Sequence, residues 1–280
     1  MEDPAPSLAP WWGTVKLDVG QAGHWAVGPC ALWIHRSDKE WRLVEDRSSD
    51  PMENHSAYTV PIPPEDWEAI TNPDDPTGTL TRFGFQKTKD TLTLHPVLGD
   101  RPFVVRPEEP IVVGPKERLT MYVSTPVWIR VTFGAGTPLE HDVPAYRPSD
   151  TWFGPNTRDG EVCYATRTTG RMQLDNLPLR MHRAVTPILI FNRASEVLPI
   201  ERIQIPVQYL ALFESPEDHF LWTQSIKMHR KEGAEGADVR IEEGAPKDAR
   251  TSERITPPRE EVKEGLAVST FRAIGSLFGS

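Results

Sequence analysis

The side chains best suited to chemistry gather between residues 147 and 183, where arginines lie close to acids, a tryptophan and a histidine. The planar guanidinium of arginine matches carboxylate and phosphate groups, so convergent arginines would bind an anion. A site of that kind would use Arg147, Asp150, Trp152, Arg158, Arg167, Arg171, His182 and Arg183. The competing interpretation is that the arginines fasten loops to the protein body by pairing with Asp150, Asp159, Glu161 and Asp175. We favour the second interpretation, because interior and interfacial arginines are usually paired.

Nucleophilic and metal chemistry find little support in the sequence. The two cysteines, Cys30 and Cys163, are too few for a disulfide framework or a cysteine-rich zinc site. Cys163 lies in a predicted strand, at a distance from His182 that matches no protease signature, so we expect a core residue. The histidines lack metal-binding spacing, and neither a G-x-S-x-G motif nor a phosphate-binding loop is present. The sequence therefore predicts no metal and no cofactor, and it favours a protein without enzymatic activity.

The chain is acidic, with 31 Lys and Arg against 40 Asp and Glu and a net charge of −9. Nucleic acid is therefore not an expected partner, because binding to phosphates needs a basic surface. The first residues are acidic and proline-rich, unlike a signal peptide, and no run of about 18 apolar residues is present. We expect a cytoplasmic protein without a transmembrane segment, which would reach the inner membrane only through a partner.

The elements that would position these side chains are strands. Alternation of apolar and polar residues with a period of two is clear at 127–133 and, over a longer stretch, at 203–213. Pro206 lies inside the longer stretch and removes a backbone donor, which indicates an edge strand or a bulge. The run Ile188–Phe191 is apolar throughout, as expected for a strand buried on both faces.

Turn signals separate these strands. Ser37–Glu40 and Thr168–Gly170 predict hairpin turns, and one turn of helix is expected at Glu65–Ile70. We therefore predict an all-β fold of two packed antiparallel β-sandwich-like units with a flexible tail and a C-terminal amphipathic helix. The predicted ranges are a flexible lead at 1–10, the two β units at 11–135 and 136–230, a charged linker at 231–256 and the helix at 257–280.

The tail after Arg230 is charged and holds few large apolar residues, which indicates a linker or a strand at Ala237–Ile241. Pro257 and Pro258 suit the first positions of the predicted helix. Its apolar face would dock through Leu266, Phe271, Ile274, Leu277 and Phe278. This face could pack on the protein's own body, in a groove of a partner or on a membrane. We rank the first two equally and the membrane third, because nearby acids oppose anionic lipid.

Several segments together resemble the DUF432 family of prokaryotic proteins of unknown function. The matching segments follow in order Trp25–Pro29, Leu32–Ile34, Asp100–Pro107, Ser149–Pro155, Gly160–Tyr164, His182–Pro187 and Glu201–Pro206. They extend over most of residues 11–230, and the Ser-Asp-Thr-Trp-Phe-Gly run is the specific one. The resemblance supplies no catalytic residues, and it implies an accessory protein of a small mechanosensitive channel.

Two classes of function follow from these observations. The first is a non-enzymatic interaction or accessory protein, a rigid β body that docks a partner through its C-terminal helix. The partner would be the cytoplasmic part of a membrane channel or a second copy of the chain. The alternative is an anion-binding protein or enzyme that uses the arginine-rich loops at 147–183. Paired arginines and a docked tail favour the first class, and convergent arginines in a pocket favour the second.

Overall fold

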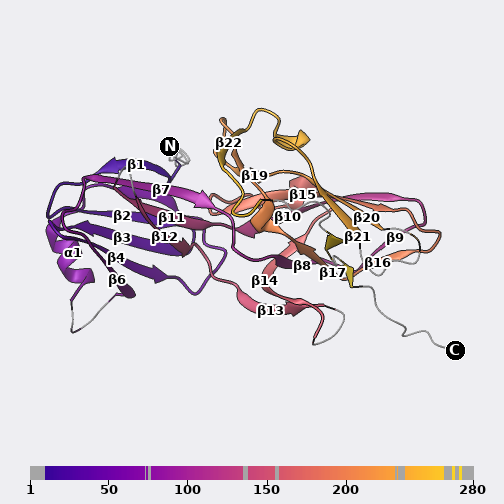
Figure 1. Cartoon of the computed structure of the whole chain (residues 1–280), viewed down its shortest axis with the longest axis horizontal. Helices are drawn as coiled ribbons and strands as arrows, with labels where there is room; N and C mark the ends of the chain where they lie inside the picture. Colours follow the sequence, from indigo (N-terminus) through magenta and orange to yellow (C-terminus); the bar gives the residue numbers. More distant parts are fainter. Residues whose placement is uncertain are drawn as a thin grey trace, which may run out of the picture. The chain divides into compact units, whose positions relative to one another are not determined.

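The computed structural model of the chain describes residues 10–261 apart from 73, 75–76, 135–137, 155–157, 231 and 233–236, together with residues 267–268 and 271–272 (Figure 1). The side chains of residues 166–169 and of those after 261 lie outside the description. Strands predominate among the described residues, so the predicted all-β class is confirmed. Within the same residues, no helix is long and apolar enough to cross a membrane.

The chain forms two compact units, each assembled from separated segments. Unit 1 consists of Met1–Val97, Val127–Tyr146 and Arg180–His182. Unit 2 consists of Leu98–Pro126, Arg147–Leu179 and Arg183–Ser280. The sequence analysis divided the chain into successive ranges instead, because the interleaving depends on which strands pair and not on local composition.

Unit 1 contains, within its described part, two antiparallel sheets (Figure 1). The first has the order β1-β7-β11-β12, with β1 at Gly13–Lys16, β7 at Thr91–Val97, β11 at Trp128–Phe133 and β12 at Leu139–Pro144. The second has the order β5-β2-β3-β4-β6, with β5 at Ser56–Thr59, β2 at Ala22–Val27, β3 at Cys30–Arg36, β4 at Glu40–Arg47 and β6 at Thr79–Gly84. The turn predicted between Ser37 and Glu40 is confirmed, because it joins β3 to β4.

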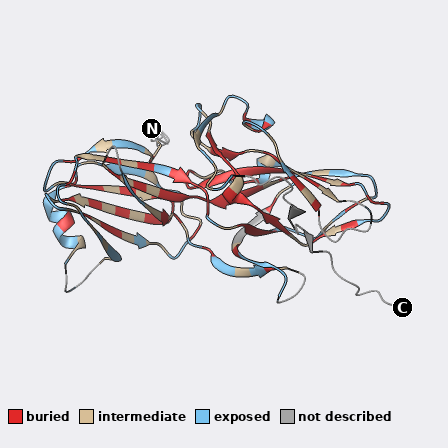
Figure 2. Cartoon of the chain, viewed as in Figure 1, coloured by how far each residue is buried: buried red, intermediate tan, exposed pale blue. Residues whose placement is uncertain are grey.

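Burial alternates along β3, as the period of a strand requires (Figure 2). Its inward residues are Cys30, Leu32, Ile34 and Arg36. The buried guanidinium of Arg36 donates from Nη1 to the carbonyl oxygen of Leu17 at 2.7 Å and from Nε to Oγ1 of Thr88 at 3.0 Å. These hydrogen bonds offset the cost of burying the charge.

Aromatic side chains connect the two sheets of unit 1. Phe133 of β11 lies 5.4 Å from Trp41 of β4 and 4.7 Å from Phe83 of β6, measured between ring centroids. The helical turn predicted at Glu65–Ile70 is confirmed as α1, which spans Pro64–Ile70 and begins with a proline. Its buried Trp67 stacks on His35 at 4.9 Å, which holds the helix against the sheet.

Within its described part, unit 2 contains two mixed sheets and a small antiparallel one. One has the order β22-β18-β19-β15-β20-β21-β23, with β10 paired to the other edge of β15. Its strands are β22 Glu253–Thr256, β18 Leu212–Glu214, β19 Leu221–Thr223, β15 Arg183–Asn192, β20 Ile226–Arg230, β21 Ala237–Ile241, β23 Ala267–Val268 and β10 Arg118–Pro126. Another has the order β13-β14-β8-β17-β24, with β13 Ser149–Phe153, β14 Glu161–Gly170, β8 Phe103–Pro107, β17 Arg202–Ile205 and β24 Phe271–Arg272. A small sheet pairs β16 Leu198–Ile200 with β9 Ile111–Val113.

The prediction of purely antiparallel pairing is wrong for unit 2. β15 pairs in parallel with β19 and β20, and β14 pairs in parallel with β8. Long connections separate these partners in the chain, and parallel pairing needs such crossovers. Ile188 and Ile190 of β15 are buried, whereas Leu189 and Phe191 are only half-buried, so the predicted burial on both faces is also wrong there.

Two local predictions need correction, and one open alternative is resolved. The alternating stretch 203–213 is no single strand, because it breaks at Pro206 into β17, a 3₁₀ turn at Val207–Tyr209 and β18 of another sheet. The predicted turn at Thr168–Gly170 lies within β14 instead. Of the two interpretations of the charged tail, a linker or a strand at Ala237–Ile241, the structure has the strand, as β21.

The described residues beyond 261 are strands and not a helix. Ala267–Val268 forms β23 against β21, and Phe271–Arg272 forms β24 against β17. The two sheet edges offer unpaired backbone groups for hydrogen bonding, and Gly265 and Gly275 weaken helix formation. The other docking residues predicted for this segment, Leu266, Ile274, Leu277 and Phe278, lie outside the described residues.

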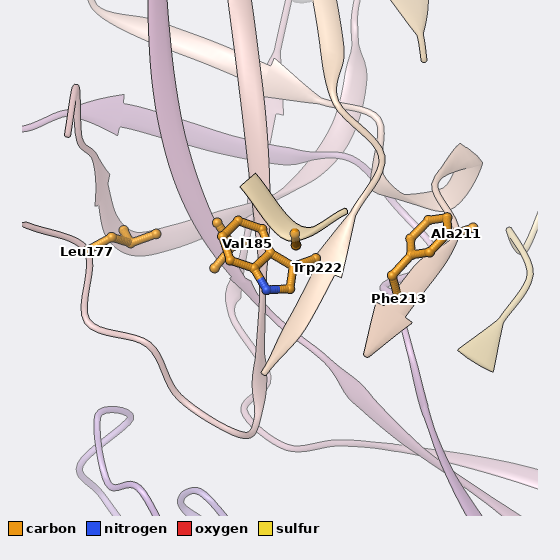
Figure 3. Close-up of a cluster of buried hydrophobic side chains, with 6 residues drawn as sticks. Leu177, Val185, Ala211, Phe213 and Trp222 are labelled. Carbon is orange, nitrogen blue, oxygen red and sulfur yellow. The ribbon is translucent and has the colours of Figure 1, made fainter. Parts of the chain in front are cut away.

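A cluster of buried apolar side chains stabilises unit 2 around Trp222 of β19 (Figure 3). Phe213 and Ala211 come from β18 and the residues before it, Val185 comes from β15, and Leu177 comes from a loop. Burying side chains of this size stabilises each by about 1.5–3 kcal/mol relative to exposure. The segment that precedes β22 contributes Ala249, so the chain beyond β21 is part of the body.

Candidate functional site

A charged cluster surrounds the start of the β13–β14 hairpin. Asp150 lies between two arginines, with Oδ1 at 3.3 Å from Nη1 of Arg101 and Oδ2 at 3.8 Å from Nη2 of Arg147. Arg101 also lies 3.8 Å from Asp100, measured from Nε to Oδ2. The side chains are about half exposed, and such pairs contribute less than about 1 kcal/mol each. They hold the loop rather than leave a guanidinium available, as the pairing interpretation expects for Arg147.

Tyr164 of β14 forms the floor of this cluster, directly opposite Asp150 in the strand register. Its hydroxyl donates to Oδ1 of Asp100 at 2.7 Å, and the guanidinium carbon of Arg101 lies 5.5 Å from its ring centroid. Burial and the neighbouring Asp100 raise the pKa of Tyr164 to about 12. The phenol is therefore protonated at neutral pH and acts as a hydrogen-bond donor to the acid.

The other arginines predicted for an anion site do not converge with Arg147. Arg171 forms an ion pair with Glu108, beside a cavity of about 390 Å³ that also contains Glu109 and Met172. Arg183 is 4% exposed and donates from Nε to Oγ of Ser124 at 2.8 Å, which makes it an internal connection between β15 and β10. Arg158 is exposed. The side chain of Arg167 lies outside the described part of the chain.

A tryptophan in the loop at 149–155 is expected to pack beneath that loop, but Trp152 lies on the surface. It is 41% exposed, while the next residue, Phe153, is 3% exposed. Successive residues of a strand point to opposite faces, and here Phe153 takes the inner face. Val162, the cross-strand partner of Trp152, is 46% exposed. The two form an apolar pair on the outer face of the hairpin.

Cys163 is a buried core residue, as expected from the sequence. It packs with Val104 and Phe153, and Nε2 of Gln204 donates to its sulfur at 3.4 Å. Burial raises the pKa of Cys163 to about 12, and that of Cys30 likewise to about 12. A thiol nucleophile needs a lowered pKa, so these positions do not suit nucleophilic catalysis.

His182 is fully buried in unit 1 beneath Gly28. Gly28 has φ +56°, and a β-carbon there would lie 2.7 Å from Cδ2 of His182 and closer still to Cγ and Nδ1. The chain around His182 is also held by its carbonyl oxygen, which accepts from the amide of Val127 at 3.0 Å. These contacts make His182 a packing residue and separate its role from that of the arginines in unit 2.

Metal ligation has no candidate among the described residues, since no group of three or more His, Cys, Asp or Glu is placed to hold an ion. Glu161 accepts a hydrogen bond from the buried amide of Gln204. That amide also contacts Cys163, so Gln204 links the carboxylate to the core rather than to a metal.

The structure also brings together a second group of charged and aromatic residues, which the sequence analysis missed. Arg118, Phe191, His229 and Asp238 lie in register across β10, β15, β20 and β21. We call this row the Phe191 face. Beside it lies an open hollow of about 390 Å³ lined by Lys116, Glu117, Arg118, Phe191, Asn192 and Arg193. Alternation within each strand marks these positions as outward, but only the pairing of distant strands brings them together.

The fold and these contacts define an all-β protein of two units, in which Arg147 and Arg171 are paired with acids and the strand residue Arg183 is held by a hydroxyl. The chain belongs to the DUF432 family, a family of proteins of unknown function, whose model matches residues 11–275. The family resemblance seen in the sequence is therefore confirmed. The comparisons with curated proteins and with solved structures gave no match.

Proposed function

We propose that this protein is a non-enzymatic interaction or accessory protein, whose β body docks a protein partner through the C-terminal segment 257–280. The observation that carries the proposal is the pairing of β23 with β21 and of β24 with β17. Both pairings are antiparallel additions to sheet edges, which is a common mode of peptide recognition. The C-terminal segment thus combines an ability to pair as a strand with a run of apolar side chains.

The candidate catalytic side chains already have partners within the protein, which supports an interaction protein over an enzyme. Cys163 and Tyr164 have raised pKa values and bury their polar atoms in local contacts. Arg147 and Arg171 are neutralised by Asp150 and Glu108. The alternative of an anion site at 147–183 is less well supported, because Arg147 and Arg171 already have acidic partners.

The partner in this proposal is the cytoplasmic part of a membrane protein, with the mechanosensitive channel implied by the family resemblance as the first case to test. Leu266, Phe271, Ile274, Leu277 and Phe278 would supply the apolar contacts, in the helical form that their spacing favours. A β-sandwich-like arrangement of the sheets would give the rigid body, and the contacts of Phe133 with Trp41 and Phe83 in unit 1 support it.

The test is co-purification from native membranes with the intact chain and with a variant carrying Phe271→Asp and Phe278→Asp. Val197→Asp is the matched control, because Val197 is 53% exposed and lies in a loop of the body. We expect the double variant to lose the membrane partner and the control to retain it, with thermal stability unchanged in both. Retention of the partner by the double variant, or a fall in its stability together with retained association, would contradict the proposal.

A further inference from the structure

We propose that the hollow lined by Lys116, Arg118 and Arg193, beside the Phe191 face of unit 2, binds a phosphate-bearing anion. The proposal is independent of the docking role of the C-terminal segment, because it rests on other elements. Its ligand is either a small soluble phosphate compound or a phosphate headgroup of a lipid, since both present the same anionic oxygens.

The first support is the convergence of cations from separate elements. Arg118 lies at the start of β10, and Arg193 directly follows β15, to which β10 is paired. Lys116 precedes β10 and donates from Nζ to the carbonyl oxygen of Arg193 at 2.5 Å, which fixes its ammonium at the rim. Among the described residues, no ion pair involves Arg118 or Arg193. Unlike Arg147 and Arg171, Arg118 and Arg193 can therefore bind an anion without first breaking an ion pair.

The acids near the hollow do not fill it. Glu232 lies 3.9 Å from Lys116, but its carboxylate also accepts from the amide and the hydroxyl of Ser195. Glu117 lines the hollow, and a β-carbon at Gly114 would lie 3.3 Å from its Cγ, so this side chain extends along its own turn. Both arginines are exposed, and among the described residues neither forms an ion pair with Glu117 or Glu232.

The second support is an aromatic pair of which one member, Phe191, lines the hollow. Phe191 and His229 stack with their centroids 4.6 Å apart and their planes 19° apart. Nδ1 of His229 is buried and has no hydrogen-bond partner among the described residues. The ring therefore offers a polar atom whose protonation can respond to charge nearby.

The third support is the field at His229. Burial lowers the pKa of His229, and the neighbouring Arg193 and Arg240 lower it further. Asp238 acts in the opposite sense, and Lys227 adds a smaller repulsion. Lys227 forms an ion pair with Glu242, and Arg240 lies directly opposite Lys227 in the strand register. A bound phosphate would offset these cations and raise the pKa of His229, so phosphate affinity increases as the pH falls.

The experiment titrates the intact protein with pyrophosphate at low ionic strength, by calorimetry and by the ¹H signal of the His229 ring. We expect saturable binding, a rise in the pKa of His229 and tighter binding at acidic than at alkaline pH. Arg118→Gln and Arg193→Gln should each weaken binding about tenfold, as the loss of a charge-assisted hydrogen bond does. Arg147→Gln is the matched control and should bind as the unaltered protein does.

Vesicles with and without phosphatidic acid distinguish the source of the phosphate. Binding to these vesicles without binding to pyrophosphate assigns the site to a lipid headgroup, provided that Arg118→Gln and Arg193→Gln abolish it. Circular dichroism verifies that the variants remain folded, which the exposure of both arginines favours. The proposal is wrong if neither probe binds, or if binding is indifferent to both substitutions and equal to that of Arg147→Gln.

Discussion

Replacing Gly28 by alanine tests the interpretation of His182 as a packing residue. Gly28 has φ +56°, and its β-carbon would lie 2.7 Å from Cδ2 of the fully buried imidazole. The left-handed conformation costs a residue with a side chain about 1–2 kcal/mol. Forcing a methyl group against a packed ring costs about 1–3 kcal/mol in addition. We therefore expect the free energy of unfolding to fall by about 2–5 kcal/mol.

Thermal and urea unfolding measure this loss. At about 2–4 °C per kcal/mol for a chain of this size, the melting temperature of the variant should fall by about 4–20 °C. Gly20→Ala is the matched control, because Gly20 has φ +92° and its β-carbon would meet no atom within 4 Å. It should lose only the conformational part, about 1–2 kcal/mol. The double variant Gly28→Ala with His182→Ala should lose less free energy of unfolding than the sum of the two single losses, because the clash is gone. Equal losses for Gly28→Ala and Gly20→Ala, or strict additivity in the double variant, would refute the reasoning.

Three further outcomes follow from the same contacts. Arg183→Ala should lower the free energy of unfolding by about 3 kcal/mol in urea titrations, because Ser124 loses a charged donor in the interior; a neutral result would disprove the internal connection. Trp152→Ala should lower it by about 1 kcal/mol or less, since the side chain is 41% exposed and contributes mainly a cross-strand pair; a loss near 4 kcal/mol would restore the packed interpretation. Cys30 and Cys163 should resist alkylation in the native protein at about pH 8.5, where a free thiol is half ionised; rapid labelling before unfolding would contradict their burial.

Local patterns in the sequence predicted local structure well. Period-two alternation identified the strand at 127–133, and turn residues identified the turn at Ser37–Glu40. The strand at Ala237–Ile241 was one of two interpretations of the charged tail. These features depend on residues that are close in the chain. Cys163 was also recognised as a core residue, because a small apolar side chain inside a strand is most often buried.

Pairing between distant strands could not be predicted in the same way. β15 pairs with β10 on one edge and in parallel with β20 on the other, and no local pattern specifies either partner. That pairing places Arg118 beside Phe191 and Phe191 beside His229. The Phe191 face therefore could not be recognised from the sequence. The arginine-rich segment at 147–183 was conspicuous in the sequence, yet Arg147, Arg171 and Arg183 make separate local contacts.

The tail shows how competing partners change a local preference. Residues 267–268 and 271–272 fit an amphipathic helix by spacing, but they pair with β21 and β17 as strands. A short helix with two glycines is marginal alone, whereas an open sheet edge supplies backbone hydrogen bonds at once. The helical form in the proposed complex would need a partner surface that competes with these edges.

The central claim is that the C-terminal segment contacts a protein partner at the membrane. A photo-crosslinking residue placed at Ile274 in the full-length chain, in native cells, tests it most directly. The account predicts a discrete cross-link to one membrane protein, which is absent when the same residue is placed at Val197 and when Phe271→Asp and Phe278→Asp are introduced. Cross-links from Ile274 only to the protein's own β body, unchanged by the two aspartates, would contradict it.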